Sequence, residues 1–130
     1  MKYIAEMTME EKVELRDALD RSIAEEQLQR SEHKMAVAYE MIGILERVLG
    51  WAYDSRSRNR MGVIFRGIIS ETLYARGFSE SQIGALIGKH HTTVHHYRYL
   101  PNEWRSLPRA FKEELRIYEQ FNNMINETNN

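Results

Sequence analysis

The sequence predicts an all-α protein, and two observations support that prediction. Long stretches place apolar residues three or four positions apart, which is the spacing of one helix face. Only two prolines and seven glycines interrupt the 130 residues. At this length we expect one helical domain over residues 61–126, preceded by a helical extension over residues 1–50 and an arginine-rich linker over residues 51–60. Residues 127–130 are expected to fray.

The composition excludes several classes of protein. The chain has no cysteine, so it forms no disulfide, thiolate nucleophile or cysteine-ligated zinc site. No apolar run approaches the roughly 18 residues of a membrane span. The first six residues lack the apolar core of a signal peptide. We therefore expect a cytoplasmic protein without a membrane partner.

Charge is distributed unevenly along the chain, although the formal net charge is only −1. Residues 1–50 hold 7 basic and 11 acidic residues. Residues 51–105 hold 8 basic and 4 acidic residues, together with four of the five histidines. A basic centre between acidic ends makes one polyanion-binding face plausible.

The extension should be helical from its first turn. Thr8 and Glu11 have capping-box spacing, which predicts a helix from about Met9. A polar stretch around Ser31 leaves open whether this helix breaks or continues through one solvated turn. A heptad-like seam of about two heptads follows, made of Met35, Ala38, Ile42, Leu45 and Leu49. The seam either packs on the chain's own domain or associates with another copy, and we favour a homodimer or higher oligomer through residues 1–50.

Residues 51–60 form the predicted linker. From Ser55 to Arg60 no residue is apolar, and arginines stand at alternate positions. Such a stretch suits phosphate contacts or insertion into a narrow minor groove. A solvated linker without a ligand is the simpler alternative.

Three helices are predicted between residues 61 and 100. Residues 61–74 have a wide apolar face and should form a buried helix. Ser79 and Gln82 have capping-box spacing and predict the next helix start. Gly88 is suited to end that helix, because glycine adopts the left-handed conformation at little cost. The usual helix-turn-helix spacing then fits six positions, namely Ile83, Gly84, Ile87, Gly88, Val94 and Tyr97.

The outward positions of the third helix favour DNA recognition. They are hydrogen-bonding and carry no carboxylate: His90, His91, Thr92, Thr93 and His96. Threonine offers a hydroxyl to a base or phosphate and a methyl group to thymine. The free N–H groups at a helix start also favour a phosphate.

The segment Gly-Lys-His-His-Thr-Thr-Val at residues 88–94 resembles the Gly-Arg-Asp-His-Thr-Thr-Val signature of domain IV, the DNA-binding domain of the bacterial replication initiator DnaA. That fold is related to the Trp repressor. The likeness covers about residues 56–100. It implies a helix-turn-helix domain that binds double-stranded DNA and reads bases in the major groove.

The resemblance also implies roles for individual residues. His91, Thr92 and Thr93 would read bases, and we expect His90, beside them at the start of the same helix, to contact a base as well. Lys89 and His96 match a basic position and a histidine of the family, and we expect both to contact phosphates or the minor groove. An arginine of the family reaches the minor groove, and Arg58 and Arg60 are the candidates for that role here.

The sequence departs from the family at three points. His90 stands where the family has an aspartate that caps the helix and accepts from a base, so the preferred DNA sequence should differ. The turn is one residue shorter, and Tyr97 is bulkier than the family's small residue. The chain also lacks the G-x-x-x-x-G-K-[ST] motif of the initiator's ATPase, so it should not hydrolyse ATP.

We therefore expect a sequence-specific DNA-binding protein in replication initiation or transcription regulation, without enzymatic activity or a cofactor. A phage-type DNA-packaging or replication accessory subunit has the same outline. A helical adaptor without DNA readout is a further alternative. His91 and His95 have a workable two-ligand spacing for zinc, but no H-E-x-x-H motif accompanies them, so no metal site is expected.

The last part of the chain should contain one more helix. Pro101 and Asn102 are expected to stop the preceding helix. Ser106 is expected to cap the last helix, with Pro108 in its first turn. An apolar stripe then indicates core packing, made of Phe111, Leu115, Tyr118, Phe121 and Ile125.

Overall fold

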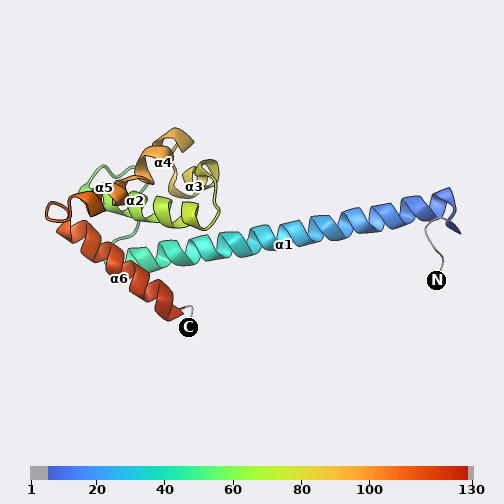
Figure 1. The fold of residues 1–130 in the computed structure, drawn as a ribbon, viewed down its shortest axis with the longest axis horizontal. Coiled ribbons are helices and arrows are strands. Elements are labelled where there is room, and N and C mark those ends of the chain that lie inside the picture. The colour runs from blue at the N-terminus through green and yellow to red at the C-terminus, as the bar shows by residue number, and fades with distance from the viewer. Residues whose placement is uncertain (1–5, 129–130) are drawn as a thin grey trace. The chain divides into compact units, whose positions relative to one another are not determined.

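The computed structural model describes residues 6–128 and contains only helices, turns and loops over that range (Figure 1). The helices are α1 (Met9–Leu49), α2 (Arg60–Ala75), α3 (Glu80–Ile87), α4 (His91–Tyr97), α5 (Leu100–Ser106) and α6 (Lys112–Thr128). The all-α prediction is confirmed. In this part of the chain, no helix combines the length and apolar character needed to span a membrane. Expectations for residues 1–5 and 129–130 fall outside the described residues.

The chain divides into two compact units, Met1–Val37 and Ala38–Asn130. The helix of the first unit begins as predicted, because the backbone N–H of Glu11 donates to Oγ1 of Thr8 (3.1 Å). It continues through Ser31 without a break. Between residues 9 and 37 no side chain is buried, and Leu19 and Leu28 are 56% and 60% exposed.

The second unit begins earlier than the predicted boundary at residue 50. The last turns of α1 belong to it, because their apolar side chains are buried in its core: Ala38, Met41, Ile44, Leu45 and Leu49. Most of the heptad-like seam therefore packs on the chain's own domain. Ala38, Leu45 and Leu49 are therefore not available to a second copy of the chain.

Helix α2 forms the centre of the second unit. It packs against α3, α4 and α5, and α5 packs against α6. Its start is fixed by Asn59, whose side chain accepts from the backbone N–H of Gly62 (2.9 Å). Gly67 allows a close crossing, because a Cβ there would lie 3.0 Å from the ring of Trp104. The fully buried apolar core is built around α2 and includes Phe65, Ile68, Ile69, Leu73, Ile83, Ile87, Val94 and Phe121.

Two predictions for the C-terminal region were wrong. Helix α4 ends at Tyr97, before Pro101, and Pro101 occupies the first turn of α5 instead. Ser106 does not cap the last helix, because its hydroxyl donates back to the carbonyl of Glu103 (2.7 Å) at the end of α5. Pro108 lies in the turn before α6. The predicted stripe of the last helix is confirmed as core at Tyr118, Phe121 and Ile125.

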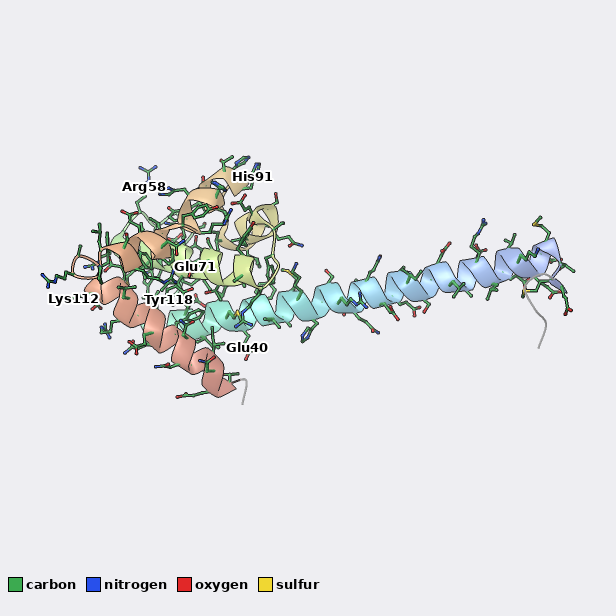
Figure 2. The ribbon with its side chains drawn as sticks, in the orientation of Figure 1. Glu40, Arg58, Glu71, His91, Lys112 and Tyr118 are labelled. Carbon is green, nitrogen blue, oxygen red and sulfur yellow. The ribbon has the colours of Figure 1, made fainter. Side chains whose placement is uncertain are left out.

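A polar cluster joins α2, α5 and α6. The hydroxyl of Tyr118 donates to Oε1 of Glu71 (2.8 Å) and lies 3.2 Å from Oγ1 of Thr72. Nη1 of Arg105 donates to Oε2 of Glu71 (3.0 Å). Burial raises the pKa of Tyr118 to about 12. Figure 2 shows Glu71 and Tyr118 among the helices of the second unit.

Candidate nucleic-acid interface

Helices α3 and α4 are joined by a tight turn. Helix α3 begins at a complete capping box, in which Ser79 and Gln82 each bond the other's backbone N–H. Gly88 ends the helix in the left-handed conformation, with φ of 70°. The next N–H, that of Lys89, donates to the carbonyl of Gly84 (2.9 Å). Both capping predictions are confirmed.

Gly84 is required by the closeness of this turn. A Cβ at Gly84 would lie 2.4 Å from the carbonyl oxygen of Lys89. That oxygen is backbone and cannot rotate away as a side chain could. Residue 84 therefore controls how closely the start of α4 approaches α3.

Helix α4 begins at His91, and His90 before it acts as the N-cap. The backbone N–H of Thr92 donates to Nδ1 of His90 (3.3 Å), and the same nitrogen lies 2.9 Å from Oγ1 of Thr92. The ring of His90 lies against that of His91, with centroids 4.1 Å apart. The side chain of His90 thus supplies the cap of α4.

The first turn of α4 presents most of the predicted contact residues to solvent. His90, His91 and Thr92 are exposed, and Thr93 is half-buried. Val94 is fully buried and anchors the opposite side of the helix. The predicted base-reading residues therefore lie together, at the start of a helix whose opposite side is held in the core by Val94. We call His90, His91, Thr92 and Thr93 the α4 tip.

Lys89 and His96, the predicted phosphate contacts, flank the α4 tip. Lys89 is half-buried in the turn before α4, and His96 is exposed near the helix end. The ring of His96 lies 5.8 Å from that of Tyr97.

His95 belongs to a different cluster from the α4 tip. Its Nδ1 lies 2.8 Å from Oε2 of Glu80, and Nε of Arg98 donates to the same oxygen (2.9 Å). The hydrogen bond from Arg98 is the main cause that lowers the pKa of Glu80. Within residues 6–128, no three histidine or carboxylate side chains are grouped to hold a metal ion. The cluster is an ion-pair network between α3 and α4.

The two candidate arginines before α2 differ. Arg58 is exposed, and in Figure 2 both Arg58 and His91 point away from the helices of the second unit. Arg60 is the first residue of α2 and its Nη2 donates to Oε1 of Glu114 (2.7 Å). That hydrogen bond raises the pKa of Arg60. Arg58 is thus the candidate available for a phosphate, whereas Arg60 is engaged within the fold.

Arg66, which is not among the residues predicted from the sequence, ties the loop of residues 51–59 to this region. Arg66 is only 1% exposed, and its Nε donates to the hydroxyl of Tyr53 (3.0 Å). The loop is therefore held by buried contacts and is not the solvated linker of the simpler alternative. A signal was present, because Arg66 stands inside the apolar stretch of residues 61–74.

No family model, curated protein or solved structure matches this chain in the comparisons with known proteins.

Proposed function

We propose that this protein binds double-stranded DNA sequence-specifically, with α4 in the major groove. The observation that supports the proposal is the α4 tip, a helix start that presents exposed imidazole and hydroxyl groups without a carboxylate. A helix of this kind delivers its first residues to base edges when it follows another helix through a short turn. The buried Val94 and the tight turn at Gly84 fix the orientation of α4 relative to α3.

The proposed contacts fall into two groups. His91, Thr92 and Thr93 would meet base edges, since imidazole and hydroxyl groups hydrogen-bond bases and the threonine methyl suits thymine. Lys89, Arg58 and the exposed His96 would meet phosphates, which position the protein without reading sequence. Arg60 would contribute less to DNA binding, because its guanidinium already donates a hydrogen bond to Glu114.

The DnaA-like signature at residues 88–94 supports a role in replication initiation or transcription regulation. The chain carries the signature without an ATPase motif. It would therefore act as a DNA-binding factor beside other proteins, and not as an ATP-dependent initiator.

Selection from random duplex DNA tests the proposal directly. The full chain is incubated with a random library at moderate salt, and bound duplexes are amplified and sequenced. We expect one enriched motif whose affinity exceeds that of random duplex by at least about 10³-fold. Equal binding of enriched and random duplex, both lost on mild salt addition, would show only polyanion attraction and overturn the proposal.

We also propose that residues 9–37 mediate self-association. This part of α1 buries no side chain, yet it carries exposed apolar residues such as Leu19, Ile23 and Leu28. A dimer would place two α4 helices on two half-sites and raise affinity above that of one module. The solution mass measured by light scattering should be at least twice the 15.4 kDa of one chain. A monomeric mass at micromolar concentration would contradict the proposal. An oligomer whose mass is unchanged when Leu19 and Ile23 are replaced with serine would contradict it as well.

A further inference from the structure

Arg66 is a buried charge whose hydrogen-bond partners are neutral. Its Nε donates to the hydroxyl of Tyr53 (3.0 Å) and its Nη1 to the hydroxyl of Tyr97 (3.4 Å). Its Nη2 donates to the backbone carbonyls of Ser55 (3.1 Å) and Ser57. Burying a guanidinium is costly unless its donors are satisfied. This geometry satisfies them with groups from two separate parts of the interface.

One of these parts is the loop that carries Arg58. The carbonyls of Ser55 and Ser57 lie on either side of Arg56, and Ser57 immediately precedes Arg58. Two hydrogen bonds donated by one Nη2 fix the path of this loop over α2. The backbone of Arg58 is therefore held from its preceding residue, although its side chain is exposed.

The other part is the α3–α4 turn and α4 itself. Tyr97 is the last residue of α4, and its ring centroid lies 5.5 Å from the guanidinium carbon. The hydroxyl of Tyr53 accepts from Arg66 and donates to the carbonyl of Ile87 (2.6 Å), the last residue of α3. Arg66 thus reaches both the start and the end of the segment that presents the α4 tip.

The loop and the turn also touch directly. A Cβ on Gly88 would lie 2.8 Å from Cβ of Ser55. The ring of Tyr53 stacks on Phe65, with centroids 4.2 Å apart and planes 12° apart. The surroundings of Arg66 are therefore close-packed, so a movement of the loop of residues 51–59 would displace the α3–α4 turn.

We propose that Arg66 is a positioning residue that holds Arg58 and the α4 tip in one fixed register on DNA. The inference rests on the proposed DNA-binding function. The planar guanidinium of Arg66 offers five donors in a rigid fork, and a lysine ammonium does not reproduce that arrangement. Without the fork, the loop and the tip would each keep their own contacts but lose their mutual spacing.

The test uses the full chain with Arg66→Lys and the matched control Arg76→Lys, which changes an exposed arginine just after α2. Affinity for the selected duplex should fall about tenfold in Arg66→Lys, with less than about twofold change on random duplex. Arg76→Lys should change neither. Equal losses on both duplexes, in proportion to the unfolded fraction, would show a merely structural role and overturn the inference.

A double-mutant cycle separates positioning from stability. Arg58→Ala and His91→Ala are combined in the natural background and in Arg66→Lys. We expect their effects to be coupled by about threefold to tenfold in the natural background and to become additive in Arg66→Lys. Additive effects in both backgrounds would contradict a shared register.

Tyr53→Phe serves if Arg66→Lys does not fold. It keeps the ring stacked on Phe65 and removes only the hydroxyl that joins Arg66 to Ile87. The same loss of duplex preference is expected from it. An unchanged preference in folded Tyr53→Phe would overturn the inference.

Amide hydrogen exchange on the free protein keeps this test apart from the proposed function. In Arg66→Lys, or in Tyr53→Phe, exchange should quicken both at Ser57 and at Lys89, whose amides donate to Asp54 and Gly84, while α6 stays unchanged. Faster exchange confined to Ser57 would refute the mechanical link. If the natural protein shows no duplex preference, the proposed function fails, and the exchange result still decides whether Arg66 couples the loop to the turn.

Discussion

Replacing Gly84 with alanine tests the turn that presents α4. In an ordinary helix interior this change stabilises a protein by about 1 kcal/mol. Here the new Cβ would lie 2.4 Å from the carbonyl oxygen of Lys89, and Cβ atoms essentially never come within 3.0 Å of a neighbour. Overpacking of this kind costs about 1–3 kcal/mol, and the upper end applies because the obstacle is backbone. We expect a net destabilisation of about 2 kcal/mol.

The change in stability can be measured by urea unfolding followed through tryptophan fluorescence. The two tryptophans, Trp51 and Trp104, both lie in the second unit, so their emission should report the unfolding of that unit. Gly43→Ala is the matched control, because a Cβ there would meet nothing within 4 Å, and Gly43 lies in the part of α1 that belongs to the second unit. It should raise the free energy of unfolding by up to about 1 kcal/mol.

The reasoning is refuted if Gly84→Ala unfolds at the same urea concentration as the natural protein or at a higher one. A second readout is affinity for the selected duplex. A turn that is pushed open should tilt the α4 tip, so the preference for the selected duplex should fall even where most of the protein is folded.

The remaining predictions concern the interface and two polar clusters. Thr92→Ala should cost about 1–3 kcal/mol on the selected duplex and relax specificity, whereas Arg58→Ala should weaken all duplexes alike and reduce the salt dependence; fluorescence anisotropy at several salt concentrations distinguishes them. The pKa of Glu80 is lowered in the fold, so its contribution to stability is present above the ordinary value of 4.5 and is lost as pH falls below it. Glu80→Gln should therefore flatten the acid side of a plot of urea midpoint against pH, and an unchanged slope would argue against the ion-pair network. Tyr118→Phe removes the hydroxyl that donates to Glu71 and should lower the free energy of unfolding by about 1–2 kcal/mol in the same urea assay.

Local signals in the sequence predicted the α3–α4 turn well. Ser79, Gln82 and Gly88 act through their own backbone and that of near neighbours, so their roles depend little on the rest of the fold. The same logic located the start of α1 at Thr8. The α4 tip followed from these boundaries, because a helix that starts after Gly88 must present its first residues together.

Ambiguous local signals explain the errors near the C-terminus. Proline is compatible with the first turn of a helix and also with a position just beyond a helix end. Pro101 could therefore mark either a stop or a start, and the structure has a start. A serine hydroxyl can cap the next helix or bond back to the previous turn, and Ser106 does the latter.

Contacts between residues far apart in sequence could not be predicted from the spacing of apolar and polar residues. Arg60 meets Glu114 across 54 positions, and Arg66 meets Tyr97 across 31. From composition alone, residues 51–60 were predicted to be an arginine-rich linker, and a solvated linker stayed open as the simpler alternative, since nothing in that stretch reveals a buried guanidinium beneath it. The seam that ends at Leu49 left two interpretations open for the same reason, because apolar spacing shows that a face is buried but not which partner buries it.

The unburied stretch of α1 has a consequence for how this protein melts. Residues 9–37 gain helicity from propensity and local charge, without a packed face to make their unfolding cooperative. Far-ultraviolet circular dichroism should therefore fall gradually on heating, over a wider temperature range than the transition of tryptophan emission from the second unit. The two curves should separate in the monomer and draw together in a dimer through residues 9–37. Comparing them across protein concentrations thus converts a simple thermal scan into a measure of assembly.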